Sequence, residues 1–527
     1  MNKILISLSL LLFLPLVGLV APFFLPGAAD PLSSNAGLVA SDTLLHLWDY
    51  VLGAYLRSTL VLMVGVAIGV FILGVGNAWI IASYEFPGKK IFEWALILPL
   101  AVPSYVMAYL FVDLLQFAGP IQSALRSWLG MERLWFFPDP RSLFGAIWTF
   151  SFCLYPYVYL ITRAAFIERS RRLIEVSETL GYSPLEAFFK LVLPMARPAI
   201  FAGMALALME VLADFGAVSY FGVQTLATGI FKAWLSFGDR ISAVQLSLTL
   251  LSFVLLIFLI EQNSRSRIRY SSSLPSASSS KLLSGKKAIC AFLVCGLTLL
   301  LGFLLPAIGL INLMYQQGFS VDMRYWNWLS NSFTVSFATA IISVVLALFF
   351  AYAVRLNRHM KWVTQLLGFG YALPGAVLSI GILSFLEIFQ LAWWISASML
   401  VLIYAYLVRF LSSSLQSIET GLSRITPSMD GSAALLGLSP FQILKRIHIP
   451  LLRRSLITAG LFVFVDVMKE LPATLLLRPF NFDTLAVATY QLAADERLSE
   501  LALPALTIVL AGLIPVYFLS KIFSRQS

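Results

Sequence analysis

Six acidic residues lie inside long apolar stretches of this sequence: Asp113, Glu210, Asp214, Glu387, Asp466 and Glu470. A charged side chain within a membrane is costly, so each acid is a candidate functional residue. Glu210 and Asp214 are four residues apart, as are Asp466 and Glu470. This spacing predicts that each pair shares one face of a helix. If the two helices pack together, four carboxylates converge, and their oxygens suit a transient site for a hard metal cation.

Two interpretations of these acids are open. In the first, the acids are structural, and Asp466 or Glu470 forms an ion pair with Lys469 or Arg478. In the second, all four acids line a translocation path for a cation. Four tyrosines could add oxygen ligands, although aromatic residues in membrane helices more often serve packing or interface anchoring. These are Tyr105, Tyr109, Tyr155 and Tyr157.

The composition predicts an all-α polytopic membrane protein. Apolar residues make up 59% of the 527 residues and charged residues 12%, with a mean hydropathy of +0.88, far from the soluble globular range. Most of the 36 Lys and Arg residues fall on one side of the predicted helices, which marks that side as cytoplasmic and argues against a nucleic-acid partner. The Gly-Lys pairs at Gly88 and Gly285 lack the first Gly of a phosphate-binding loop. We therefore expect no catalytic residue, no ATPase and no bound cofactor in this chain.

Apolar stretches predict about twelve membrane-spanning helices, arranged as two pseudosymmetric sets of six. The first set is 4–24, 53–83, 91–118, 143–167, 197–219 and 241–262, and the second is 288–312, 329–355, 364–389, 391–415, 455–477 and 500–522. We interpret 4–24 as a retained helix, because cleaving it as a signal peptide would spoil the twofold count. A Ser-rich basic linker at 263–287 separates a first half (1–262) from a second (288–527), with the linker and both termini cytoplasmic.

One charged segment occurs twice, at about 175–198 and about 430–454. Gly181, Ser183, Pro184, Pro194 and Arg197 recur 256 positions later as Gly437, Ser439, Pro440, Pro450 and Arg453. Each copy predicts a helix of about ten residues, with Ser as N-cap, Pro at the first position and a capping box closed by Glu186 or Gln442. The later Pro is expected to end that helix. With the same offset Glu210 matches Asp466 and Asp214 matches Glu470, which favours matched halves around a central path.

The repeated segment resembles the cytoplasmic EAA loop of ABC-importer permeases. Glu175 stands at the Glu place of the first copy, and Gly431, after Asp430, stands there in the second. The resemblance implies two coupling helices, each docked on an ATPase subunit, with Phe188, Phe189, Ile443 and Leu444 buried against it. The residues expected to form these contacts are Glu175, Gly181, Ser183, Pro184, Phe188, Phe189, Pro194, Gly437, Ser439, Pro440, Ile443, Leu444 and Pro450.

The runs at 209–234 and 468–498 look like the corresponding parts of fused ferric-iron ABC permeases. That resemblance implies the type I ABC importer fold and a permease in the bacterial inner membrane. It also implies two ATPase copies that use ATP and Mg²⁺, and a periplasmic iron-binding protein. Glu210, Asp214, Asp466 and Glu470 would then line the ferric-iron path. The alternatives are an ABC permease for another small solute such as thiamine, or a secondary ion-coupled transporter.

Overall fold

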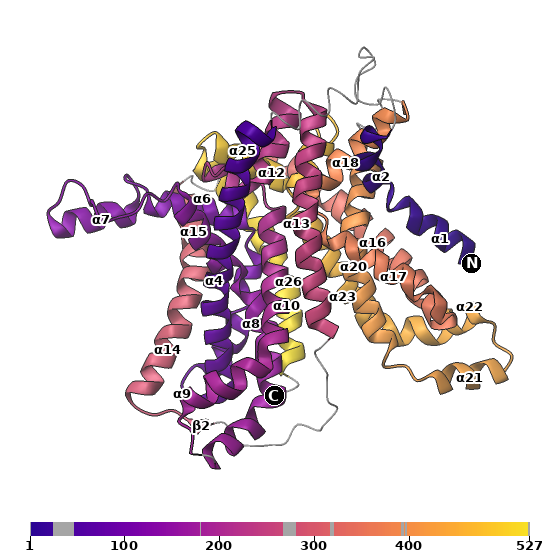
Figure 1. The fold of residues 1–527 in the computed structure, drawn as a ribbon, viewed down its shortest axis with the longest axis horizontal. Coiled ribbons are helices and arrows are strands. Elements are labelled where there is room, and N and C mark those ends of the chain that lie inside the picture. Colours follow the sequence, from indigo (N-terminus) through magenta and orange to yellow (C-terminus); the bar gives the residue numbers. More distant parts are fainter. Residues whose placement is uncertain are drawn as a thin grey trace.

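The computed structural model describes residues 2–24, 47–179, 181–266, 281–316, 321–391, 395 and 398–524 (Figure 1). These residues are almost entirely helical. Up to residue 266 the helices are α1 (Asn2–Leu11), α2 (Leu14–Val20), η1 (Ala21–Phe23), η2 (Leu47–Leu52), α4 (Gly53–Ser83), α5 (Lys89–Ala95), η3 (Leu98–Ala101), α6 (Ser104–Leu115), α7 (Pro120–Leu129), α8 (Leu143–Thr179), α9 (Pro184–Ala187), η4 (Phe188–Val192), α10 (Leu193–Ala213), α11 (Gly216–Tyr220), α12 (Leu226–Phe231), η5 (Lys232–Ser236) and α13 (Arg240–Ser266).

The remaining helices follow residue 280. They are α14 (Lys286–Leu299), η6 (Leu300–Leu304), α15 (Leu305–Gln316), α16 (Met323–Leu356), η7 (Arg358–Met360), α17 (Lys361–Gly368), η8 (Phe369–Ala372), α18 (Gly375–Ile388), α20 (Met399–Leu422), α21 (Pro427–Leu435), α22 (Pro440–Ile443), η9 (Leu444–His448), α23 (Ile449–Met468), α24 (Pro472–Leu477), α25 (Leu485–Ala494) and α26 (Leu498–Ser524).

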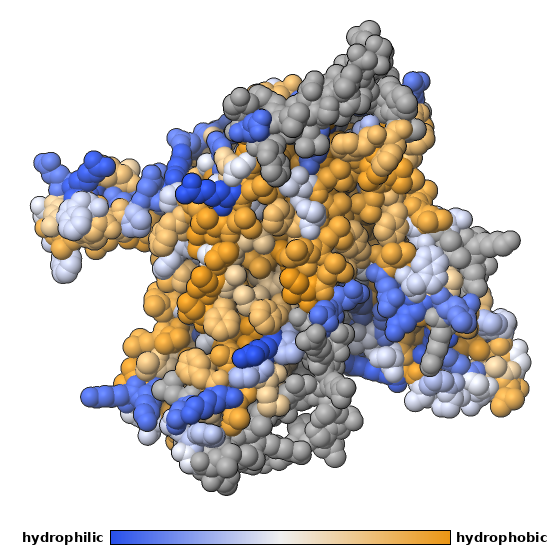
Figure 2. Space-filling model, viewed as in Figure 1, coloured by the Kyte–Doolittle hydropathy of each residue, from blue (hydrophilic) through white to orange (hydrophobic). Residues whose placement is uncertain are grey.

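Nine helical stretches of the described residues are long and apolar enough to cross a membrane, or ten if one bent pair counts as a span. They are 53–83, 104–129, 143–167, 188–213, 240–263, 286–316, 323–356, 399–423 and 498–518, and the bent pair is 361–372 with 375–388. Figure 2 shows their apolar surface as an orange band across the middle of the molecule, with hydrophilic groups gathered above and below it. The chain is therefore a polytopic helical membrane protein.

Several of the twelve predicted spans differ from single long helices. The expected helix at 4–24 divides into α1 and α2, because Pro15 begins a new helix. The span at 364–389 is bent by 108° between η8 and α18. The span at 455–477 ends at Met468, and α23 carries three charged residues, Arg453, Arg454 and Asp466.

Prolines interrupt the helical backbone at two corresponding places. The expected span at 91–118 is interrupted between η3 and α6, where Pro103 has extended backbone geometry. Pro374 has the same geometry between η8 and α18. Each proline has no amide hydrogen and keeps the residue before it out of the helical region, so one helix ends and another begins there. Irregular backbone at membrane depth is tolerated only where it is buried in protein or lines a cavity.

Helices from the start of each part of the chain pack against the other part. α2 packs on α18, while α14 contacts α4 and α5, and α15 contacts α6. The α2 contact is backbone to backbone, since a Cβ atom on Gly18 would lie 2.0 Å from the carbonyl oxygen of Gly381. Small residues permit such close helix approach in membranes. Each of the two buried apolar clusters therefore combines residues from before and after position 280.

The predicted linker is shorter than 263–287. α13 continues to Ser266, and α14 begins at Lys286. Before α14, β2 (Lys281–Leu282) pairs in parallel with β1 (Tyr84–Glu85), which follows α4. This pairing holds the end of the linker beside the loop that precedes α5. The remainder of the predicted linker, 267–280, lies outside the described residues.

Candidate translocation site and coupling segments

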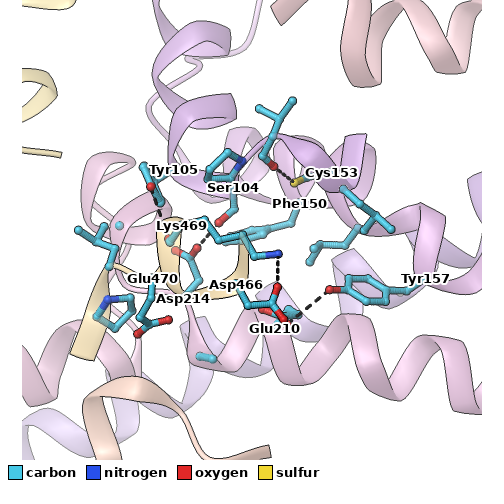
Figure 3. A pocket seen from close by; sticks show the side chains of 18 of the residues that line it. Ser104, Tyr105, Phe150, Cys153, Tyr157, Glu210, Asp214, Asp466, Lys469 and Glu470 are labelled. Carbon is cyan, nitrogen blue, oxygen red and sulfur yellow. Dashed lines mark hydrogen bonds and ion pairs between the residues drawn. The ribbon is translucent and has the colours of Figure 1, made fainter. Parts of the chain in front are cut away.

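Helix breaks from both parts of the chain line one cavity of about 90 Å³. All four predicted acids border it, together with two basic residues, Lys469 and Arg409. Figure 3 shows the labelled side chains converging from α6, α8, and the ends of α10 and α23. The predicted convergence of Glu210, Asp214, Asp466 and Glu470 is therefore present in the structure.

The prediction that each acid pair shares one helical face is wrong. α10 ends at Ala213, and Asp214 has extended geometry (φ −78°, ψ 132°). Its carboxylate Oδ1 accepts the amide hydrogen of Ala217 at 2.8 Å and so caps α11. Glu470 follows the end of α23 in the same way, and its Oε1 accepts the amide hydrogen of Ala473 at 3.0 Å. Asp214 and Glu470 thus lie in the breaks between two helices. Each carboxylate accepts a hydrogen bond from a free backbone amide at the start of the next short helix.

The second partners of these two capping acids differ. Ser104, the first residue of α6, donates its hydroxyl hydrogen to Asp214. Gly375, the first residue of α18, leaves room beside Glu470, which pairs with the Arg409 guanidinium. Both members of that ion pair are buried. Cys153, 256 positions before Arg409, instead donates its thiol hydrogen to the Val102 carbonyl at 3.4 Å. Glu470, from the later part of the chain, is therefore paired with a basic side chain, whereas the described partners of Asp214, from the earlier part, are uncharged.

The structural interpretation of the acids is confirmed in part. Lys469 Nζ lies 3.0 Å from Asp466 Oδ1, as that interpretation predicts. Glu470 pairs with Arg409 instead of Lys469 or Arg478. Arg478 is paired with Asp483. Sequence reasoning missed Arg409, whose only signal was a lone charge inside an apolar run.

Glu210 is the one acid of the four whose hydrogen-bond partners, among the described residues, are phenols. Its Oε1 accepts from Tyr371 Oη at 3.0 Å and from Tyr157 Oη at 3.5 Å. These hydroxyls come from η8 and α8. Tyr371 was not predicted, because it precedes the Pro374 break and lies far from Glu210 in the sequence.

Other predicted candidates lie elsewhere. Tyr105 lines the cavity, whereas Tyr109 and Tyr155 are buried outside it. Glu387 pairs with Arg240. Asp113 accepts a hydrogen bond from Gln116 at 3.4 Å. Within the described part of the chain, no three Asp, Glu, His or Cys side chains are placed to hold a metal ion together.

A second cavity of about 550 Å³ lies between α10, α13, α16, α17 and α20. Its lining includes Arg355, Lys361, Glu261 and Glu419 at the ends of these helices. Tyr371 lines this cavity as well as the smaller one. A single tyrosine therefore borders both spaces.

The two predicted capping boxes are present at the start of the coupling segments. Glu186 accepts the Ser183 amide hydrogen at 3.0 Å, and Ser183 Oγ accepts that of Glu186 at 3.3 Å. Ser439 and Gln442 exchange the same two bonds. Hydrogen bonds from the Ser183 backbone and side chain, together with Lys190, lower the pKa of the exposed Glu186 carboxyl to about 2. The side chains of Glu175 and Pro184 lie outside the described residues.

The expected ends of the coupling helices at Pro194 and Pro450 are wrong. Both prolines occupy the first turn of the next helix, α10 or α23, where their missing amide hydrogen is not needed. A π-helical turn, η4 or η9, joins each coupling segment to that helix. Figure 1 places α9 and α22 towards the lower edge of the molecule, with α21 beside α22. Gly181 and Gly437 have φ of +75° and +80°, so glycine suits both helix breaks.

The apolar contacts predicted for the coupling segments are partly wrong. Ile443 and Leu444 are buried within the chain, so they have little surface to offer a partner. Phe188 is half-buried, with its ring 4.8 Å from that of Trp79, whereas Phe189 is exposed. The most exposed large apolar side chains on the second segment are those of Leu435, Leu436 and Phe441.

The second coupling segment is held by a polar network. Arg355 Nε lies 2.7 Å from Asp430 Oδ2, and His448 Nε2 lies 2.8 Å from Asp430 Oδ1. Arg355 also donates to the carbonyls of Leu422 and Ile425, both at 2.9 Å. Burial acts to raise the pKa of Asp430, but hydrogen bonds from Arg355 and His448 hold it below its usual value. Asp430 therefore ties α21 to α16 and η9.

Comparison with known proteins gives one family match. Residues 65–270 match the family described as binding-protein-dependent transport system inner membrane component. The Fe(3+)-transport system permease protein FbpB 2 of Haemophilus influenzae is 28% identical over 476 residues, covering 88% of this chain and 89% of that protein. This similarity extends over nearly the whole chain.

Two shorter relatives match part of the chain. The molybdenum transport system permease protein ModB of Escherichia coli is 25% identical over 41% of this chain and 92% of its own length. The putative 2-aminoethylphosphonate transport system permease protein PhnV of Salmonella paratyphi A is 27% identical over 36% of this chain and 70% of its own length. With the helical membrane fold, these matches show that the chain is similar to inner-membrane permease components of binding-protein-dependent transport systems.

Proposed function

We propose that this chain forms the path by which an ATP-driven importer takes up ferric iron delivered by a periplasmic binding protein. The similarity to an Fe(3+)-transport permease over 88% of the chain is the observation that carries this proposal. The cavity supports it, because four carboxylates face only two basic side chains there. An excess of fixed negative charge attracts a cation and repels an anionic solute such as a phosphonate.

We further propose two six-helix halves, 1–262 and 288–527, with two coupling segments that dock two ATPase subunits. The paired capping boxes support this arrangement, as do the capping acids Asp214 and Glu470, 256 positions apart. A relative that fits 92% of its length into 41% of this chain also supports it. In this proposal α1 with α2, and α23 with α24, complete the two sets of six. The coupling segments, the linker and both termini are cytoplasmic.

The proposed path predicts graded effects of carboxylate removal. Glu210→Gln or Asp466→Asn alone should slow iron uptake, and the paired change should nearly abolish it, because each amide keeps the shape but loses the charge that stabilises a passing cation. The matched control is Glu387→Gln, which removes an acid outside the cavity. Uptake normalised to assembled complex should fall only for cavity variants. Unchanged uptake in the paired variant would rule out a carboxylate path here.

The experiment that tests the function is reconstitution of the chain with its ATPase and binding proteins in liposomes. Ferric-loaded binding protein should stimulate ATP hydrolysis and give ATP-dependent iron accumulation. Stimulation by thiamine and not by ferric iron would establish the alternative ABC permease. Accumulation driven by an ion gradient without ATPase would establish a secondary transporter.

A further inference from the structure

We infer that Tyr157, Glu210 and Tyr371 form the site where the ferric ion is bound in transit, at the junction of the two cavities. This inference rests on the proposed function and names the ligands of the path. Three oxygen atoms from α8, α10 and η8 meet there, since both phenols donate to Glu210 Oε1. All three residues line the smaller cavity and are only partly buried, so an ion in that cavity can reach them.

Glu210 is distinguished from the other three acids by its partners. Asp466 is already ion-paired with the Lys469 ammonium, and Glu470 is ion-paired with the Arg409 guanidinium. Asp214 is occupied by Ser104 and by backbone amides that it caps. These contacts would have to break before an ion could bind. The two phenols on Glu210 are different, because each can lose its own proton and become a ligand.

The chemistry of the cluster selects a trivalent hard cation. When the ion binds, each tyrosine O–H bond breaks and an oxygen–iron bond forms, and the two protons pass to water in the cavity. Iron stays ferric throughout, so no oxidant or reductant is required. One carboxylate and two phenolates carry three negative charges, which balance Fe³⁺. A monovalent cation such as thiamine has too little charge to displace phenolic protons.

The position of Tyr371 indicates the direction in which an ion would leave the site. Tyr371 borders the larger cavity as well as the smaller one. Met209, next to Glu210, also faces that larger space. An ion held by the three oxygens therefore stands between the two cavities, with the larger one on the side that we propose to be cytoplasmic. Three protein ligands leave coordination positions open, which favours release over storage.

The test uses the full chain in nanodiscs titrated with ferric nitrilotriacetate. Phenolate ligands on ferric iron give a visible charge-transfer band, which carboxylates alone do not give. We expect this band in the wild type, with two protons released per ion, a weaker band with one proton released in Tyr371→Phe and in Tyr157→Phe, and its loss in the double variant. Tyr406→Phe is the matched control, because Tyr406 is fully buried and bonds Thr474 outside the cavity. It should keep the band.

Two outcomes would overturn the site, and a third would overturn the function on which it rests. If the wild type imports iron but gives no charge-transfer band, the proposed tyrosine–glutamate site is wrong, while the proposed function still holds. The same conclusion follows if a band persists in the Tyr157→Phe/Tyr371→Phe double variant. If the reconstituted wild type imports no iron, the proposed function fails. Each single variant removes one oxygen atom, and co-purification with the ATPase measures whether the complex still assembles.

Discussion

Replacing Arg409 by methionine would leave a carboxylate stranded in the core. Arg409 and Glu470 expose only 9% and 5% of their side chains. Without the guanidinium, the described partner of the Glu470 carboxylate is the Ala473 amide at 3.0 Å. Removing one partner of a buried ion pair costs about 3–5 kcal/mol.

We therefore expect Arg409→Met to lower the free energy of unfolding by about 3–5 kcal/mol. The double variant Arg409→Met/Glu470→Gln should recover at least half of the loss, because no unpaired charge is left. Ser104→Ala is the comparison at the other capping acid. It removes one hydrogen bond to a charged group and should cost about 1.5–3 kcal/mol.

Unfolding of the purified chain, followed by denaturant titration in the same lipid nanodisc, measures these differences. A double variant no more stable than Arg409→Met would refute the reasoning. It would mean that Arg409 acts through packing and not through its charge.

Three further predictions concern the coupling segments and the topology. Gly437→Ala and Gly181→Ala should each weaken ATPase binding by ~5-fold or more, from the ~1–2 kcal/mol cost of a left-handed non-glycine residue. Gly431→Ala, which adds a methyl to helical α21 where no atom lies within 4 Å, should bind normally, and pull-down with the ATPase compares them. Asp430→Asn should speed hydrogen exchange of 427–443 at neutral pH. The depressed pKa of Asp430 means that its stabilisation is complete above the usual value of ~3.9 and fades as pH falls through the folded value, so wild type and variant should converge in acid. A reporter inserted within 267–280 should be cytoplasmic, and an externally accessible one would overturn the proposed orientation.

Most of the local signals in the sequence were interpreted correctly. Ser183 and Ser439 cap their helices as their spacing to Glu186 and Gln442 predicts. Apolar runs of more than twenty residues identified α4, α13 and α16, because an apolar run of this length is typical of a helix that spans a membrane. The acids converge on one cavity, which follows from the high cost of leaving a charge in lipid.

The errors arose where the backbone departs from one regular helix. Asp214 follows Glu210, and Glu470 follows Asp466, by four residues, which in one continuous helix would place each pair on one face. Instead, Asp214 and Glu470 each lie after the end of a helix and cap the next one. The spacing of the residues alone does not show where a helix ends. Ile443 and Leu444 were predicted to contact the ATPase because they lie in the segment that resembles a coupling helix. In a continuous helix Leu444, His448 and Leu452 share one face at intervals of four, and all three are buried. Tyr371 and Arg409 reach the cavity through tertiary packing, which no local pattern encodes.

The backbone contact between Gly18 and Gly381 has a consequence for biosynthesis. Gly381 is added about 360 residues after Gly18, so at ~5–20 residues per second α2 waits about 20–70 s for α18. During that interval the small-residue face of α2 lies open to lipid or to any other helix nearby. Because α14 and α15 pack on the earlier part of the chain, neither part reaches its final packing before the other is made. A ribosome that stalls between residues 280 and 375 would therefore leave a nascent chain in which α2 lacks its main partner, α18.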